Sequence, residues 1–280
     1  MRILPESTRL RVKDKPFQTP TLYSTHPGHP FQCTPFPSIM PTILISGAAS
    51  GLGRAFLNAY ANEKSNTIIA IDKENVQPSE YQQYAATVQS HIVDVTSEAS
   101  INSLATLLSE TPIDLFIHSV GIRGLVPAVE NAQPESVAAA ETLHVMDLST
   151  LMHTFQVNAA ATFLLLRSLL PNLKQAHNGK VVIMSSRMGS IGHNTTGSAY
   201  AYRASKAALN SIIKSFSIDV PEVVFVLCHP GRVESKLVKY KEEAAISAEE
   251  SVAGLFPLVE NWNKNDSGQF YDRFGQPIVW

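Results

Sequence analysis

Residues 42–55 read TILISGAASGLGRA, and this stretch decides the fold. The β-branched and aliphatic run Thr42–Ser46 predicts a buried strand. Gly47, Gly51 and Gly53 follow at once, where a helical pattern begins. Because glycine permits a tight turn and close backbone approach, free N–H groups at the start of that helix can hold a pyrophosphate. The stretch therefore predicts the first strand, phosphate-binding turn and helix of a parallel α/β sheet.

The rest of the chain repeats this alternation of strand-like and helical patterns, which is typical of consecutive βαβ units. The expected strands are 42–46, 67–71, 88–93, 113–118, 179–185, 222–228 and 268–271. The expected helices are 51–62, 97–109, 148–175, 199–219 and 247–261, with a short one at Ala138–Ala140. We predict an α/β fold for residues 41–280: a single-domain, doubly wound Rossmann-type parallel sheet flanked by helices.

Composition and charge argue against several classes of partner. The chain is 44% hydrophobic and 16% charged, which suits a sheet buried between two helical layers. The formal net charge of −2 gives no positive field toward nucleic acid or an anionic membrane. No apolar run has the length of a membrane span, and the N-terminus lacks the apolar stretch of a secretory signal. Cys33 and Cys228 do not support a disulfide framework, so we expect a cytoplasmic protein without nucleic-acid or membrane partners.

Residues 1–40 differ from the rest of the chain. They hold seven of the 17 prolines and show neither helical nor alternating periodicity. We expect a disordered N-terminal extension, because such a segment buries little apolar surface. Met40 stands directly before the first strand, so a misplaced start codon is an open alternative. An organelle transit peptide is disfavoured, because acidic residues and prolines interrupt the basic positions.

Acidic residues end the second and third predicted strands. Asp72 lies about 20 residues after Gly53, where a carboxylate can accept the adenosine-ribose hydroxyls of a dinucleotide. A turn residue at a strand end is the alternative. A carboxylate there repels a 2′-phosphate, so we expect NAD, with NADP possible because Lys73 follows. Asp94 and Val95 are expected to hold the adenine, unless Asp94 caps the next helix.

A tyrosine and a lysine four residues apart follow the fifth strand. Tyr202 and Lys206 share one helical face, so the ammonium can favour the phenolate electrostatically. A phenol whose pKa is normally about 10 can then act as acid or base closer to neutrality. Tyr60 and Lys64 show the same spacing, but they lie far along the first helix. The pair Ser185–Ser186, which ends strand five, can hydrogen-bond a substrate oxygen beside Tyr202.

These residues and their order resemble the short-chain dehydrogenase/reductase family, and the resemblance covers nearly everything after Met40. Residues 200–210, YAYRASKAALN, are similar to its C-factor/sniffer-like carbonyl reductase branch, as are His229-Pro-Gly231 and the C-terminal GQPIVW. The resemblance implies an NAD(P)-dependent oxidoreductase that interconverts a small-molecule carbonyl and a secondary alcohol by hydride transfer.

The resemblance also implies residue roles. Tyr202 is the acid/base, Ser186 orients the carbonyl with Ser185 as the alternative, and Lys206 also holds the nicotinamide ribose. Asn158 matches a helix asparagine that supports a water-linked proton relay; a buried, helix-kinking asparagine is the alternative. The expected catalytic residues are Asn158, Ser186, Tyr202 and Lys206. The expected cofactor-binding residues are Gly47, Ser50, Gly51, Leu52, Gly53, Asp72, Asp94, Val95, Gly121, Tyr202, Lys206 and Val233, and no metal site is expected.

The chain departs from the family pattern after the fourth strand. Where the family has Asn-Asn-Ala-Gly, this sequence has HSVG at residues 118–121, so the asparagine contacts that brace the sheet are expected to be missing. His118 is expected to be a packing residue and not a base. The altered motif supports a rival hypothesis, a dinucleotide-binding scaffold or signalling protein without turnover. A third reading is an enzyme of the same fold that catalyses dehydration or epimerisation.

Substrate and assembly are less determined by the sequence. Residues 187–198 and 235–248 are expected to line the substrate pocket, but their mixed composition does not identify a substrate. The helical segment Phe163–Leu170 is strongly apolar, which predicts a subunit interface and a homo-oligomer; burial in the core explains it equally well.

Overall fold

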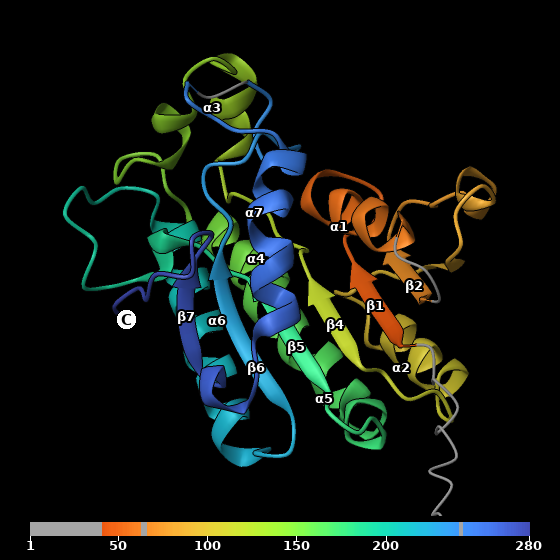
Figure 1. Cartoon of the computed structure of the whole chain (residues 1–280). Coiled ribbons are helices and arrows are strands. Elements are labelled where there is room, and N and C mark those ends of the chain that lie inside the picture. The colour runs from red at the N-terminus through yellow and green to blue at the C-terminus, as the bar shows by residue number, and fades with distance from the viewer. Residues whose placement is uncertain (1–40, 63–65, 241–242) are drawn as a thin grey trace, which may run out of the picture. The chain divides into compact units, whose positions relative to one another are not determined.

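Seven strands form one sheet in the order β3-β2-β1-β4-β5-β6-β7, and every neighbouring pair is parallel (Figure 1). The computed structural model describes residues 41–62, 66–240 and 243–280. The extension expected over residues 1–40 lies outside these ranges.

The element bounds agree closely with the expected ones. The strands are β1 Thr42–Ser46, β2 Thr67–Asp72, β3 Thr87–Ile92, β4 Leu115–His118, β5 Lys180–Met184, β6 Val224–His229 and β7 Gln269–Asp272. The helices are α1 Gly51–Asn62, α2 Glu98–Leu107, α3 Pro127–Ala132, α4 Leu148–Phe155, α5 Ala161–Gln175, α6 Tyr200–Asp219 and α7 Ala248–Asn261. The expected helix 148–175 is interrupted by the π-helical segment Gln156–Ala160, and the short helix over Ala138–Ala140 is the 3-10 helix Val137–Glu141. Helix α3 was not expected.

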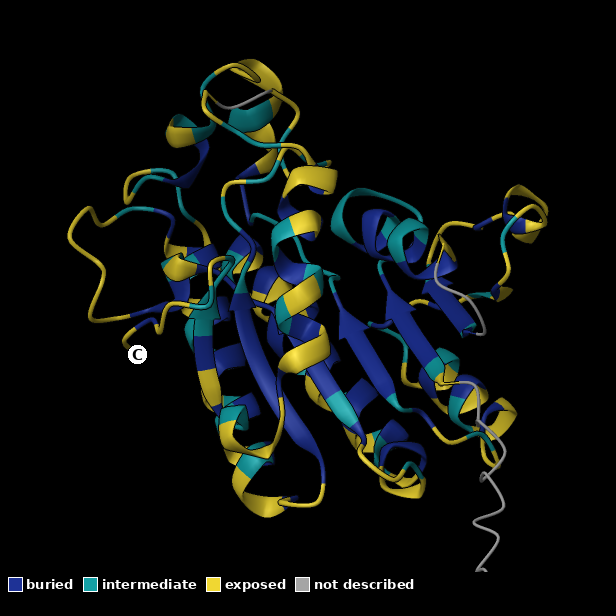
Figure 2. Ribbon diagram, in the orientation of Figure 1, coloured by how far each residue is buried: buried dark blue, intermediate teal, exposed yellow. Residues whose placement is uncertain are grey.

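Helices cover both faces of the sheet, because its central strands are apolar at successive positions. In β1, Leu44 packs toward α2, α5 and α6, whereas Ile43 and Ile45 pack toward α1 and α7. Since strand side chains alternate between faces, a strand covered on both sides needs this unbroken apolar run. Figure 2 shows the central strands as the most continuously buried part of the fold. The predicted doubly wound Rossmann-type sheet is confirmed.

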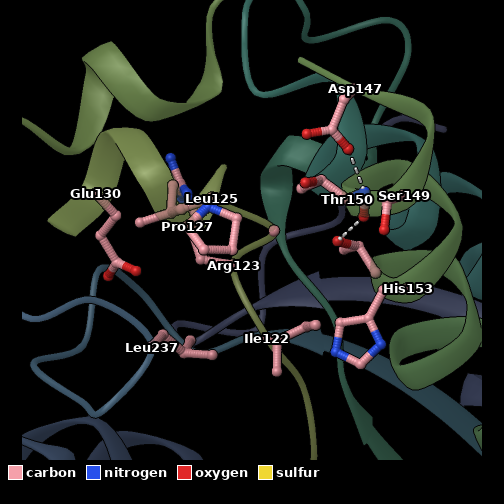
Figure 3. Close-up of a pocket in the computed structure, with 12 residues that line it drawn as sticks. Ile122, Arg123, Leu125, Pro127, Glu130, Asp147, Ser149, Thr150, His153 and Leu237 are labelled. Atoms are coloured by element: carbon pink, nitrogen blue, oxygen red, sulfur yellow. Dashed lines mark hydrogen bonds between the residues drawn. The ribbon is translucent and has the colours of Figure 1, made fainter. Parts of the chain in front are cut away.

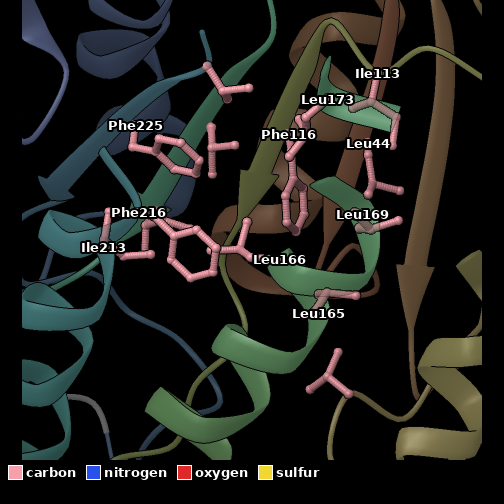
Figure 4. Packing of buried hydrophobic residues seen from close by; sticks show 14 of the residues in the cluster. Leu44, Ile113, Phe116, Leu165, Leu166, Leu169, Leu173, Ile213, Phe216 and Phe225 are labelled. Carbon is pink, nitrogen blue, oxygen red and sulfur yellow. The ribbon is translucent and has the colours of Figure 1, made fainter. Parts of the chain in front are cut away.

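The apolar segment of α5 is mainly core. Leu165, Leu166 and Leu169 are 0% exposed and pack with Phe116 of β4 and with α6 (Figure 4). Full burial of each such side chain contributes roughly 1.5–3 kcal/mol. Phe163 differs, because 39% of its surface stays exposed. Core burial therefore accounts for the leucines of this segment, and Phe163 is the exposed aromatic residue on its outer side.

The strand order reverses between β1 and β4, which are neighbours in the sheet although β2 and β3 lie between them in the chain. In open α/β sheets, ligands bind at such a switch point, beyond the carboxyl ends of the strands. The segments after β1, β4, β5 and β6 meet at that edge of the sheet, so the fold itself positions a site there.

His118 ends β4 and is buried, with contacts at both ring nitrogens. Its Nδ1 lies 2.8 Å from Ser46 Oγ at the end of β1, and its Nε2 lies 2.9 Å from Thr162 Oγ1 on α5. The hydroxyl of Ser119 donates to the carbonyl oxygen of Ser46 over 2.6 Å. The side chains of His118 and Ser119 therefore link β1, β4 and α5 at the positions where the family pattern has asparagines.

Burial lowers the pKa of His118 from 6.5 to about 3, with a smaller effect from the charge of Lys206. Between pH 6.5 and about 3, the unfolded chain binds a proton at this histidine and the folded chain does not. The free energy of unfolding is therefore highest above pH 6.5, with respect to this group, and falls as the pH is lowered toward 3. The loss approaches about 1.4 kcal/mol per pH unit. We predict that His118→Asn makes this acid-dependent decline in the free energy of unfolding less steep.

The measurement is chemical unfolding at a series of pH values from about 7 to about 4. His177→Asn is the control, because His177 is exposed between α5 and β5, and it should leave the decline as in the wild type. An equally steep decline in His118→Asn would contradict the assignment.

Candidate active site

A cavity of about 490 Å³ lies at the carboxyl edge of the sheet. It is formed by the segments that follow the first six strands and by the start of α6. Its lining contains most of the residues expected from the sequence, namely Gly47, Ser50, Gly51, Leu52, Asp72, Asp94, Val95, Gly121, Ser186, Tyr202, Lys206 and Val233. Two expected residues, Gly53 and Asn158, are absent from this lining.

The glycine-rich turn after β1 packs closely against the segment after β4 because it carries no Cβ at Gly47. Gly47 has a φ of 72°, and a Cβ there would lie 2.9 Å from Ser119 Oγ. Gly53 has another function, because its Cβ would lie 2.1 Å from the carbonyl oxygen of Gly47. Gly53 therefore lets α1 pack against the turn, and its role as a cofactor contact stays a prediction. Gly51 begins α1 and lines the cavity, which fits a pyrophosphate at a helix N-terminus.

The carboxylate of Asp72 is fixed at one end of the cavity. Its Oδ2 accepts a hydrogen bond from the backbone N–H of Ala49 over 2.9 Å, and its Oδ1 accepts one from Glu74 over 3.1 Å. Asp72 is therefore both a strand-end turn residue and a cavity residue. Lys73 and Lys236 line the same end of the cavity, and the ammonium of Lys236 lies 3.2 Å from the carboxylate of Glu74.

Asp94 is exposed at the same end. Its carboxylate accepts hydrogen bonds from the hydroxyl and the backbone N–H of Thr96, and these bonds lower the pKa of Asp94. The alternative role as a helix cap is wrong, because Ser97 caps α2 and its Oγ accepts from the N–H of Ser100.

Lys206 is buried in the wall of the cavity, with 3% of its surface exposed. Its ammonium donates to the carbonyl oxygen of Met184 over 3.0 Å. A Cβ on Gly121 would lie 3.5 Å from that ammonium, so the glycine leaves room beside it. Burial lowers the pKa of Lys206 from 10.5 to about 8. The lysine is therefore a cation at neutral pH and becomes neutral in mildly alkaline solution.

Tyr202 lies one helical turn before Lys206, as the spacing predicts. The ammonium of Lys206 is 5.8 Å from the centroid of the tyrosine ring. A second cation is closer, since the guanidinium carbon of Arg123 lies 4.9 Å from the same centroid. Sequence reasoning missed Arg123, although a charged residue in the apolar segment after Gly121 could have drawn attention to it.

Asn158 is fully buried behind the cavity, in the π-helical segment between α4 and α5. Its Oδ1 accepts from the N–H of Ile122 over 2.8 Å. Its Nδ2 donates to the carbonyl oxygen of Ile122 and to Ser205 Oγ. The side chain therefore ties the loop after β4 to α6, at a point where the helix is also interrupted.

The two serines after β5 have different partners. Ser185 Oγ donates to Asn210 Oδ1 over 2.5 Å, so its proton is used within the protein. Ser186 Oγ accepts from the N–H of Met188 over 3.2 Å, a bond that does not use the hydroxyl proton. Ser186 is therefore the better placed of the two to donate to a ligand oxygen in the cavity.

A second cavity of about 330 Å³ adjoins the first and shares Ile122, His153 and Leu237 with it (Figure 3). Most of its lining comes from the segment after β4 and from α4, and includes Arg123, Leu125, Pro127, Glu130, Asp147, Ser149 and Thr150. The expectation for residues 187–198 is wrong, because none of them lines either cavity. Of the second expected segment, 235–248, residues 235–237 line the cavities.

Within the described ranges, no helix is long and apolar enough to cross a membrane. The same residues contain no group of three or more His, Cys, Asp or Glu side chains placed to hold a metal ion. Cys228, on β6, is buried as a free thiol.

The fold and the comparisons with known proteins define an α/β oxidoreductase that uses a nicotinamide dinucleotide. The chain belongs to the short chain dehydrogenase family, whose sequence profile matches residues 41–245. It is 34% identical over 182 residues to the C-signal protein of Myxococcus xanthus, across 64% of this chain and 100% of that protein. It is 28% identical over 250 residues to 1-hydroxy-2-glutathionyl-2-methyl-3-butene dehydrogenase of a Rhodococcus species, across 86% of this chain and 100% of the relative.

Solved structures agree with this membership. The NADPH-bound carbonyl reductase from chicken fatty liver superposes with a TM-score of 0.72 at 25% identity, covering 86% of this chain and 99% of that one. The carbonyl reductase Sniffer of D. melanogaster has the same fold, with a TM-score of 0.70 at 22% identity over 86% of this chain and 100% of its own. The similarity to C-signal, together with this shared fold, confirms the resemblance to the C-factor/sniffer-like branch.

We predict that Lys206→Met raises the free energy of unfolding at pH 7 by on the order of 1 to 3 kcal/mol, because it removes a desolvated charge. Between about pH 8 and pH 10.5, Lys206 binds a proton in the unfolded chain but not in the folded one. The free energy of unfolding of the wild type therefore rises with pH in that range. The difference in the free energy of unfolding between Lys206→Met and the wild type should be largest below pH 8 and should vanish toward pH 10.5.

Chemical unfolding across this pH range provides the measurement. Lys214→Met is a matched control, because it removes a lysine-to-carbonyl hydrogen bond from a less buried position on the same helix. It should not stabilise the protein. A variant at Lys206 that is less stable than the wild type at pH 7 would show that burial of this ammonium is not costly.

Proposed function

We propose that this protein is an NAD(P)-dependent oxidoreductase that interconverts a carbonyl and a secondary alcohol, with Tyr202 as the acid/base. The observation that carries the proposal is the buried ammonium of Lys206, 5.8 Å from the ring centroid of Tyr202, in the cavity that the glycine turn also lines. A bound nicotinamide supplies the hydride for reduction and accepts it for oxidation.

In reduction, the hydroxyl of Tyr202 donates its proton to the carbonyl oxygen as negative charge develops there. Ser186 hydrogen-bonds the same oxygen and fixes its position. The cation of Lys206 favours the phenolate that remains, because opposite charges within a buried site attract strongly. Asn158 keeps the loop after β4 in place and is our candidate for the relay that returns a proton to Tyr202. Oxidation uses the same groups in reverse.

The dinucleotide fits along the line from Asp72 to Lys206. We assign the pyrophosphate to the turn at Gly47 and Gly51, the adenosine to the end with Asp72, Asp94 and Val95, and the nicotinamide to the end with Gly121 and Val233. Lys206 also holds the nicotinamide ribose. Supporting this arrangement, these residues line one continuous cavity whose glycine turn opens onto the N-terminus of α1.

The second cavity is our candidate for the distal part of the substrate. It adjoins the cofactor cavity through Ile122, His153 and Leu237, and its size suits a small or medium-sized molecule. Apolar side chains of Leu125 and Pro127 lie in the same cavity as the hydroxyls of α4. A substrate with an apolar body and a few hydroxyl or carbonyl groups matches such a wall.

The rival role, a dinucleotide-binding scaffold without turnover, drew its support from the altered motif after β4. Because His118 and Ser119 still link β1 to β4, that alteration gives no reason to infer lost activity. Dehydration or epimerisation remains a different reaction of the same fold, and no feature of the cavity favours it.

For the wider setting, we propose a single catalytic domain over residues 41–280, a cytoplasmic location and a homo-oligomer. The described part from residue 41 onward forms one compact unit. Leu148, Met152 and Phe155 form an exposed apolar stripe on α4, which supports association through that helix.

Tyr202→Phe should lower turnover by ~10² or more, because it removes the proton donor and keeps the ring. Ser186→Ala should also lower turnover, with dinucleotide binding retained. The measurement is NAD(P)H absorbance across a panel of ketones and alcohols. Tyr60→Phe is the control: its hydroxyl donates to Glu260, so stability can fall by about 1 kcal/mol while turnover stays unchanged. Near wild-type turnover in Tyr202→Phe would refute the assignment.

For the cofactor, we propose that Asp72 favours NAD(H), because its carboxylate can accept ribose hydroxyls and repels a 2′-phosphate. Asp72→Ala should weaken NAD(H) binding and relax the rejection of NADP(H), as measured by fluorescence titration of each cofactor. If the wild type binds NADP(H) more tightly, Lys73 and Lys236 would instead be the residues that decide cofactor choice.

A further inference from the structure

We propose that Arg123 is a positioning residue for Tyr202, and that Glu141 holds it in place. The inference rests on the proposed role of Tyr202 as the acid/base. Arg123 lies in the loop after β4 and lines the second cavity, and Glu141 ends the 3-10 helix Val137–Glu141. Arg123 therefore contacts both the second cavity and the ring of Tyr202.

The guanidinium of Arg123 is fixed in one plane by two hydrogen bonds. Its Nε donates to Glu141 Oε2 over 2.8 Å, and its Nη2 donates to Glu141 Oε1 over 2.9 Å. The two side chains are only 16% and 9% exposed. Paired bonds of this kind fix orientation as well as distance. The guanidinium is thereby held 4.9 Å from the ring centroid of Tyr202, within range of a cation–π contact.

Glu141 also fastens the start of the helix that carries Tyr202. Its backbone carbonyl accepts from the N–H of Ala199 over 2.9 Å and from Ser198 Oγ over 3.0 Å. Ser198 and Ala199 have φ values of 56° and 50°, a left-handed conformation that residues with a Cβ rarely adopt. Such a conformation persists only where the surroundings hold it, and Glu141 supplies two of the bonds that do so.

The same arginine reaches the segment of Ser186. Its Nη1 lies 3.2 Å from the sulfur of Met188, two residues after that serine. The Arg123–Glu141 pair therefore contacts both segments that deliver the proposed catalytic hydroxyls. An error in their relative position of about 1 Å can cost ~10²-fold in rate, which makes a rigid link between them valuable.

The charges around Tyr202 give this pair a second effect. Lys206 faces the ring from the same helix, and Arg123 faces it from the loop after β4. Glu141 is the ion-pair partner of Arg123. His153 and His229 line the cavity from α4 and β6. A guanidinium remains charged at every accessible pH, whereas Lys206 becomes neutral above about 8. Arg123 therefore favours the phenolate, and the carboxylate of Glu141 partly cancels that field.

Substitutions in the pair should shift the pKa of Tyr202 in opposite directions. Arg123→Met should raise it by roughly 0.5 to 1 unit. Glu141→Gln should lower it, because the variant removes the negative charge while its amide oxygen still accepts one hydrogen bond from the guanidinium. Arg123→Lys keeps the charge without the planar fork, so it should leave the pKa nearer the wild-type value and still lower kcat. The control is Arg203→Met, because Arg203 bonds to Gly197 and Thr196 and should not affect Tyr202.

The readout is the ultraviolet absorbance of the phenolate, taken as the difference between each protein and the same protein carrying Tyr202→Phe. This titration needs no substrate, so it is decisive for the pair even if no ketone or alcohol is turned over. Far-ultraviolet circular dichroism identifies folded variants; if Arg123→Met does not fold, Glu141→Gln and Arg123→Lys carry the test. Unchanged pKa values, or shifts in the same direction for both kinds of variant, would overturn the proposal.

Discussion

The ammonium of Lys206 is buried at the carboxyl edge of the sheet, where a backbone carbonyl is its hydrogen-bond partner. A buried charge is costly unless its surroundings are arranged for it. Gly121 leaves room beside the ammonium, and Asn158 fixes the loop that carries Gly121. The proposed chemistry depends on the burial of this ammonium, because a cation that is kept out of water interacts strongly with the neighbouring phenol of Tyr202.

The braces at this edge use different side chains from those the family pattern suggests. The imidazole of His118 spans from Ser46 on β1 to Thr162 on α5, and it stays neutral because burial lowers its pKa to about 3. Arg123 and Glu141 in turn connect the start of the helix that carries Tyr202 with the segment that carries Ser186. Thr162 also donates to the backbone carbonyl of Asn158, and Arg123 lies 4.9 Å from the ring centroid of Tyr202. Both arrangements therefore couple the shape of the site to the packing of the fold.

The sheet and much of the cavity could be predicted from the sequence, because apolar runs such as Thr42–Ser46 and the glycine turn after them are local signals. Tyr202, Lys206 and Ser186 were found through their place after one strand. Arg123 and Glu141 could not be found in this way, since they are 18 residues apart and meet only through an irregular segment. The motif around Gly53 could not show that this glycine is also needed for the packing of α1 against the turn, because that contact depends on the fold.

The measurement that tests the central claim most directly is isotope transfer. NADH and NADPH labelled with deuterium at C4 of the nicotinamide are supplied with a panel of ketones, and the alcohol products are analysed by mass spectrometry. The account predicts one deuterium on the carbinol carbon of each product molecule. A protein that binds the labelled cofactor and yields no labelled alcohol from any ketone would contradict it.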